Sequence, residues 1–340
     1  MKRLLIAYAA GLAASGAAFA HHGGAAYDMT RRVTIEGTVT ALSWQNPHSI
    51  MTLETEGPDG ARLQQEIEVM AVSQARGLGL RREAISPGAR VVVRAAPNRR
   101  GSGRAFGLDV TTRDGVVMPL SSFARFSAAA PPAVEARGLE GRWVPTVESF
   151  GKMVATGPAA RLTEAGRAAQ QEVLSRYADP GGAPAGICEP LSPPLLHIFP
   201  DLRTIEIADR TVVIRSETNG VKQERVVHVD QEAHPAGFER TAEGHSIGRW
   251  EGGTLVIDTV GFAPSRTADL ILLPSHPATH LFEKLTLTQD RRHLEYEVTV
   301  DIPAYLVEPV TLRATWDHRP DLEPSGVACD PEMARRSLRD

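Results

Sequence analysis

The chain has 340 residues and a formal net charge of −4, which becomes −6 when Lys2 and Arg3 leave with a predicted signal peptide. Charge that is acidic and spread along the chain argues against nucleic acid as a partner, because binding phosphates needs a basic surface. The length predicts two domains.

The first 20 residues have the features of a signal peptide. Residues 2–3 are basic, residues 4–14 are apolar, and residues 18–20 read Ala-Phe-Ala, which is typical of a cleavage site. The apolar run is too short to span a bilayer, which needs about 20 residues, and no later run is long enough. We therefore expect a periplasmic or secreted protein that is cleaved near Ala20, begins at His21 and has no membrane span. An uncleaved anchor is the alternative.

Residues 21–126 are predicted to form the first domain, made mostly of strands. The expected strands are 33–42, 50–55, 63–70, 91–93 and 106–112, with a short helix at 71–78. Three strands, a helix and two strands are the order of an OB-like five-stranded barrel. A stretch rich in Ala and Pro at 127–138 then indicates a linker.

Residues 139–340 are predicted to form a second, larger domain. A strand begins at Gly141, and one helix is expected to start with Thr163 as its N-cap and run to Tyr177. The expected strands that follow are 195–199, 204–208, 211–217, 224–230, 246–250, 254–260, 281–289, 294–301 and 310–316. Antiparallel strands joined by short turns favour a lipocalin-like β-barrel, a fold that can hold one small ligand.

The chain has two cysteines, Cys188 and Cys329. An even pair in an oxidising compartment predicts one disulfide. It would close a loop of about 140 residues, which the chain-entropy model makes worth roughly 4–5 kcal/mol.

Both halves of the chain resemble exported bacterial proteins of unknown function. In the N-terminal half, the resemblance rests on the His-His start at 21–28, the strand at 33–39 and Trp-Gln-Asn-Pro-His at 44–48. In the C-terminal half, it rests on Gly-His-Ser-Ile-Gly-Arg-Trp-Glu-Gly and the following residues at 244–259, and on 275–283. Gly253 stands where this second, secreted group usually has Asp. The resemblance implies the fold and export, and no particular activity.

Cleavage before His21 would create a terminus that binds metal. An N-terminal histidine offers its α-amine and Nδ1, and a further imidazole completes a T-shaped copper site, the histidine brace. His48, at the turn between the first two expected strands, or His22 would supply that nitrogen. Imidazole and amine donors suit Cu(II). The alternative is that a free His-His terminus binds copper or nickel adventitiously and that His48 is a solvated turn residue.

A second group of candidate residues lies in the expected C-terminal barrel. The catalytic candidates are His245, His276, His280, Glu283 and Asp258. A histidine beside a carboxylate in an apolar cavity is the usual arrangement for general acid–base catalysis. Spacing alone would also allow His276 and His280 to bind zinc from one face of a helix, but the prolines at 274 and 277 disfavour a helix. With 11 histidines in the chain, chance clustering is the alternative.

Arg249, Trp250 and Glu251 have a structural interpretation, in which the arginine stacks on the tryptophan and pairs with the acid.

Two functions are consistent with these patterns. The first is a periplasmic two-domain binding protein with a copper site at the mature N-terminus and a small apolar ligand in the C-terminal barrel. The alternative is a secreted isomerase, cyclase or lyase that acts on a hydrophobic or aromatic substrate in the barrel. The enzyme needs His245, His276 or His280 to meet Glu283 or Asp258 in a closed apolar pocket.

Overall fold

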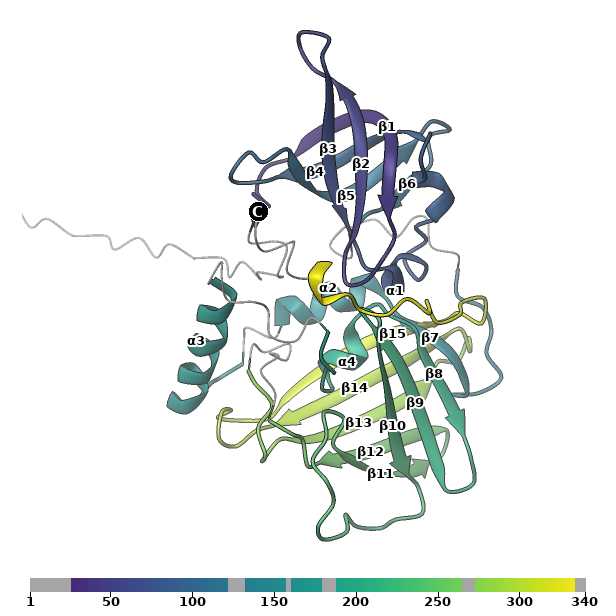
Figure 1. Cartoon of the computed structure of the whole chain (residues 1–340). Helices are drawn as coiled ribbons and strands as arrows, with labels where there is room; N and C mark the ends of the chain where they lie inside the picture. Colours follow the sequence, from purple (N-terminus) through teal and green to yellow (C-terminus); the bar gives the residue numbers. More distant parts are fainter. Residues whose placement is uncertain (1–25, 122–131, 157–159, 179–187, 265–272, 334–340) are drawn as a thin grey trace, which may run out of the picture.

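A computed structural model describes residues 26–121, 132–156, 160–178, 188–264 and 273–333. These residues form two closed β-barrels, one above the other in Figure 1. The mainly-β architecture with two barrels is therefore confirmed. The predicted signal peptide, the candidate ligands His21 and His22, and the first part of the predicted linker lie outside the described residues.

The N-terminal barrel contains the five predicted strands. They are β1 (Val33–Ser43), β2 (Ser49–Glu56), β3 (Arg62–Val69), β4 (Arg90–Pro97) and β5 (Arg104–Thr112), and a short unpredicted strand, β6 (Val117–Pro119), adds to the edge. The strand order is β3-β2-β1-β4-β5-β6, and parallel pairing of β3 with β5 closes the barrel. The helix α1 (Val72–Ala75), shorter than predicted, and a 3-10 turn at Arg82–Ile85 connect β3 to β4.

The C-terminal barrel is a ring of nine strands. They are β7 (Gly141–Pro145), β8 (Arg203–Ile207), β9 (Thr211–Thr218), β10 (Val221–His228), β11 (His245–Glu251), β12 (Thr254–Val260), β13 (His280–Leu287), β14 (His293–Asp301) and β15 (Val310–His318). All neighbours are antiparallel except β10 and β11. An odd number of strands cannot alternate in direction around a closed ring, so one parallel pair is required. Such a pair needs a long connection, which residues 229–244 supply.

The helices of the second domain differ from the single predicted one. The predicted helix is present as α3 (Glu164–Ala178), and its N-cap is confirmed because the Gly166 N–H donates to Thr163 Oγ1 over 3.0 Å. Two helices were not predicted, α2 (Val147–Thr156) and α4 (Leu195–Ile198). The predicted strand at 195–199 is wrong, because a run of four or five apolar residues does not distinguish a strand from a buried helical turn.

The predicted disulfide is confirmed between Cys188 and Cys329. It holds the C-terminal segment 325–330, which passes between the two barrels in Figure 1. There, Asn46 Nδ2 donates to the Val327 carbonyl over 2.7 Å, and the Asp330 N–H donates to the Asn46 carbonyl over 2.9 Å. The Asn-Pro-His turn at 46–48 of the N-terminal barrel is therefore attached to the cystine-bound tail of the second domain. No helix in the described ranges is long and apolar enough to cross a membrane.

Candidate functional site

Four histidines and one aspartate gather on the outer wall of the C-terminal barrel. We call this group the outer histidine cluster; its members are His228 on β10, His234 in the 229–244 connection, His245 on β11, Asp258 on β12 and His280 on β13. Strand alternation places them outside, because their strand neighbours Val227, Ser246, Thr259 and Leu281 are buried inside the barrel. The cluster therefore forms where the one parallel strand pair and its long connection meet the next two strands.

Asp258 is the centre of this cluster. One of its oxygens, Oδ1, lies 2.6 Å from His280 Nε2 and 3.1 Å from His234 Nε2. His234 Nδ1 in turn lies 2.8 Å from His245 Nδ1. An ionised carboxylate only accepts hydrogen bonds, so both Nε2 atoms donate to Asp258, and His234 Nδ1 accepts from His245. The result is a continuous hydrogen-bonded chain of three rings and one carboxylate, all partly exposed.

Aromatic rings pack beside the cluster. His245 stacks between His228, at a ring distance of 5.3 Å, and Phe238, at 5.0 Å. Partial burial, followed by the neighbouring His234 and His228, lowers the pKa of His245 below its ordinary value. The Phe282 ring lies 4.0 Å from the His280 ring and is 45% exposed. These contacts favour a neutral His245 and leave one apolar ring open to solvent.

A different polar group fills the inside of the same wall. We call it the inner network; its members are Arg225, Glu283, His197, Tyr296, Ser246 and Thr259. The Arg225 guanidinium pairs with both Glu283 oxygens, and the Tyr296 hydroxyl donates to Glu283 Oε1 over 2.8 Å. His197 enters from α4 with Nε2 2.8 Å from Arg225 Nη1. Arg225 and Glu283 are at most 2% exposed, so this part of the interior is filled by side chains.

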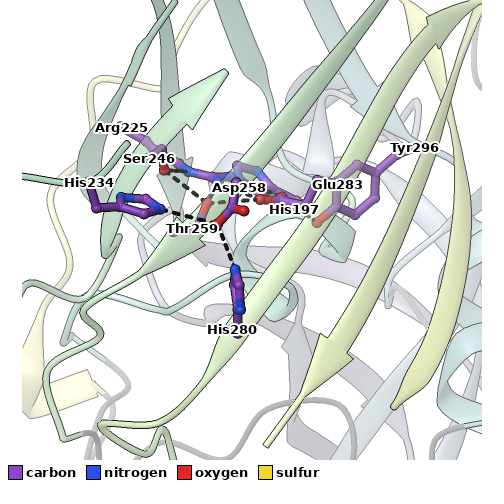
Figure 2. A network of polar contacts seen from close by, with 9 residues as sticks. All are labelled: His197, Arg225, His234, Ser246, Asp258, Thr259, His280, Glu283 and Tyr296. Atoms are coloured by element: carbon purple, nitrogen blue, oxygen red, sulfur yellow. Dashed lines mark hydrogen bonds and ion pairs between the residues drawn. The ribbon is translucent and has the colours of Figure 1, made fainter. Parts of the chain in front are cut away.

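The barrel wall separates the two groups. Asp258 and Thr259 are successive residues of β12 and point to opposite sides, as Figure 2 shows. Among the predicted catalytic residues, His280 pairs directly with Asp258 and His245 joins them through His234, all outside. Glu283 lies inside with Arg225. The histidines and carboxylates thus meet on the outer wall, and not in the closed apolar interior that the enzyme interpretation requires.

His276 lies apart from both groups. Its ring packs against Tyr305 at 4.9 Å, and its Nδ1 accepts from the Ala278 N–H over 3.0 Å. Its contacts among the described residues include none with the outer histidine cluster. The prolines on either side hold it in a turn before β13, consistent with the absence of a helix there.

The strand-end set on β11 is exposed. Arg249 Nε donates to Glu251 Oε1 over 2.8 Å, with both side chains more than half exposed, and Trp250 is 41% exposed. An ion pair of this kind contributes at most about 1 kcal/mol.

His48 occupies a defined position in the N-terminal barrel. Its Nδ1 lies 3.0 Å from Glu68 Oε1, and the Tyr27 hydroxyl donates to the other oxygen of Glu68 over 2.9 Å. Glu68 and Tyr27 are buried, whereas His48 is partly exposed. The contact between His48 and Glu68 is an ion-pair distance without hydrogen-bond geometry, so Glu68 Oε1 keeps no hydrogen-bond partner among the described residues.

Several of these residues were not identified from the sequence. His234 and His228 do not belong to any motif, and the fact that β10 and β11 are parallel neighbours brings them to His245 only in the folded chain. Arg225 and His197 were missed because a buried arginine has no pattern of its own in a strand that also carries exposed charges. Within the described residues, no three histidine, cysteine or acidic side chains are arranged to hold a metal ion as they stand.

Comparisons with known proteins cover part of the chain. Residues 10–108 match a family of unknown function, DUF6152. No curated protein matches the chain. The match agrees with the N-terminal resemblance, while the resemblance of the C-terminal half stays a prediction. The N-terminal barrel is therefore similar to a sequence family of unknown function.

Proposed function

We propose that this chain is an exported, periplasmic two-domain binding protein that takes up copper at its mature N-terminus. The observation that carries the proposal is the buried Glu68 carboxylate, which has one oxygen without a hydrogen-bond partner 3.0 Å from His48 Nδ1 and accepts from the Tyr27 hydroxyl through the other. Tyr27 lies six residues after the expected terminus at His21. Its hydrogen bond to Glu68 holds Tyr27 against the same carboxylate that His48 approaches.

The available donors fit Cu(II). His48 Nε2 is one imidazole nitrogen, and His21 would add its α-amine and Nδ1, with His22 as the other candidate ring. Nitrogen donors of this type suit Cu(II), which stands at the top of the affinity order for divalent first-row metals. The copper ion would supply a positive charge and open coordination positions, and Glu68 would keep His48 in the binding orientation.

The small apolar ligand of the C-terminal barrel stays a prediction. The interior side chains next to the inner network, such as Leu255, Ile257 and Leu281, are fully buried and packed together. A ligand would have to displace them or the α4 side chains that cover Arg225. The proposed binding function is therefore assigned to the copper site of His21, His22 and His48.

The test uses the protein exported with its own signal peptide and purified without an N-terminal tag. Intact mass should show that the chain starts at His21. Titration with Cu²⁺, followed by electron paramagnetic resonance and calorimetry, should show a high-affinity ion with nitrogen ligands whose binding requires the free amine of His21. Replacing both His21 and His22 with alanine, which leaves no imidazole at the mature terminus, should abolish this site. Glu68→Gln should weaken it by roughly 10–100-fold, the usual effect of losing a residue that orients a ligand.

A matched control separates this site from the outer histidine cluster. All titrations are repeated with Asp258→Asn, which alters the outer histidine cluster and leaves the N-terminal barrel unchanged. His293→Ala removes another partly exposed histidine that faces an aspartate. An unchanged copper affinity after replacement of both His21 and His22 with alanine would show that the proposed site does not exist.

A further inference from the structure

We propose that the outer histidine cluster is a second binding site, for a divalent transition-metal ion, with His234, Asp258 and His280 as ligands. This site is independent of the mature N-terminus and lies on the other domain. Its three donor atoms are His234 Nε2, Asp258 Oδ1 and His280 Nε2. Two imidazoles and one carboxylate on one side of a metal are a known ligand set that leaves further coordination positions open.

The distances already have the scale of a coordination shell. Both Nε2 atoms converge on Asp258 Oδ1, at 2.6 Å from His280 and 3.1 Å from His234. For bonds of about 2.1 Å to a metal, neighbouring donors in an octahedral shell lie about 3 Å apart. Without a metal, the two N–H protons occupy the space between these donors. Hydrogen bonds therefore connect the three proposed ligands to one another. This explains why the described residues contain no group that holds a metal ion as it stands.

Metal binding requires only that the rings exchange tautomers and turn slightly. Each ring moves its proton from Nε2 to Nδ1, so that both Nε2 lone pairs face the ion. His234 Nδ1–H then donates to His245 Nδ1, at 2.8 Å, after His245 has moved its own proton to Nε2. His245 is thus a positioning residue that holds His234 from outside the ligand set. His234 has room to turn because it belongs to the 229–244 connection and not to a strand.

The surroundings of these three side chains favour binding of a metal cation over a purely structural role. Asp258 is the only carboxylate that the described contacts of these rings include. His234, Asp258 and His280 are each between one fifth and one third exposed, so an ion can reach them from solvent. The wall behind them is buried and apolar at Ile257 and Leu281, which fixes the strands that carry Asp258 and His280.

The test uses the full chain with an N-terminal tag, because a tag removes the free amine at His21 and with it the site proposed at the mature terminus. Calorimetry with Zn²⁺ should show one equivalent bound, and Co²⁺ should give visible absorption bands typical of nitrogen and oxygen ligands. Asp258→Asn and His280→Gln should each weaken Zn²⁺ binding by more than tenfold. His245→Phe, which retains the stacking on Phe238, should weaken it by roughly 10–100-fold.

The matched control is His293 with Asp317, a second outward pair of the same chemistry. His293 Nδ1 lies 2.9 Å from Asp317 Oδ1, and both side chains have exposures similar to those of His280 and Asp258. Asp317→Asn should leave Zn²⁺ binding unchanged. The proposal is overturned if the tagged chain binds no Zn²⁺, or if Asp317→Asn weakens binding as much as Asp258→Asn. If Asp258→Asn does not fold, His280→Gln tests the same loss of Zn²⁺ binding. Neither result bears on the copper site at the mature terminus, which the titration of the untagged protein tests.

Discussion

Arg225 and Glu283 form an ion pair in the closed interior of the C-terminal barrel. Burial alone would lower the pKa of Arg225, but the charge of Glu283 raises it above the ordinary value, so the guanidinium stays charged. Glu283→Gln leaves that charge buried without a counter-ion. We expect the free energy of unfolding to fall by about 3–5 kcal/mol, measured by urea denaturation.

Glu297 is the matched control for this substitution. It lies on the neighbouring strand β14 but points outward, where its carboxylate pairs with an exposed Arg313. Glu297→Gln should change the free energy of unfolding by less than about 1 kcal/mol. Equal effects of the two glutamine variants would mean that the inner pair contributes no more than a surface pair.

The buried His197 predicts how the stability of the protein depends on pH. Burial, followed by the charges of Arg225 and Arg203, lowers the pKa of His197 well below 6.5, so the folded protein keeps this ring neutral. Below about pH 6.5 the unfolded chain binds a proton that the folded chain does not, and stability must fall as the pH falls. His197→Gln keeps an acceptor for Arg225 but does not titrate.

The comparison of the two proteins isolates this one histidine. From pH 6.5 to pH 5, the unmodified protein should lose up to about 1.4 kcal/mol per pH unit relative to His197→Gln, measured by urea denaturation across that range. Asp201 has the opposite effect on the free energy of unfolding. Burial raises its pKa to about 6, so its contribution to stability increases as the pH falls. Both proteins contain Asp201, so its contribution cancels. Parallel stability curves would contradict the prediction.

Helices α2 and α3 respond differently to the same substitution. In α3, a Cβ on Gly166 would stand closer to the Tyr305 carbonyl oxygen than real Cβ contacts do, whereas in α2 a Cβ on Gly151 meets nothing. Gly166→Ala should therefore push α3 away from residues 302–306 and lower the melting temperature. Gly151→Ala should raise stability by roughly 0.5–1 kcal/mol, because alanine loses less backbone entropy in a helix. Thermal denaturation followed by circular dichroism would show opposite shifts.

The elements also show what a sequence can predict. Alternation of apolar and polar residues was sufficient for β1 to β5 and β8 to β15, because one face of each strand is buried in a barrel. Four apolar residues at α4 were not sufficient, since their helical turn is set by packing over the barrel end. The parallel pairing of β10 with β11 follows from ring closure, which no local pattern contains.

The candidate site was predictable to the extent that its residues lie on predicted strands. His245, Asp258 and His280 were chosen from the sequence and do come together, whereas Glu283 was chosen with them but points inward. Strand periodicity puts Leu281, Glu283 and Leu285 on one face of β13, but it does not show which face lies inside the barrel. His234 lies in a connection whose path depends on tertiary contacts, so the sequence alone did not identify it.

At the scale of the whole molecule, Asn46 joins the two barrels. Its side chain donates to the Val327 carbonyl and accepts from the Ser73 N–H over 3.3 Å, so one amide connects the tail, the turn and α1. A second contact between the domains runs from Arg319 Nη1 to the Gly77 carbonyl over 3.3 Å. The tail itself is fixed to the C-terminal barrel by the disulfide at Cys329. The described contacts between the domains therefore include these polar bonds around a covalently attached tail and apolar packing of Val147 against the core of the N-terminal barrel.

Asn46→Ala should loosen this coupling without unfolding either barrel. The substitution leaves the part-buried Val327 carbonyl and Ser73 N–H without these partners, at a cost of up to about 1–3 kcal/mol for each group. Hydrogen exchange should become at least tenfold faster at the Ser73 amide and along residues 325–330, where every 1.4 kcal/mol corresponds to about tenfold. Asn98→Ala is the matched control, because Asn98 is also buried in the N-terminal barrel but its side-chain oxygen accepts from the Arg100 N–H, over 2.8 Å, within its own turn. Exchange along the tail that is equally fast in both variants would show that Asn46 acts through the stability of its own barrel and does not join the domains.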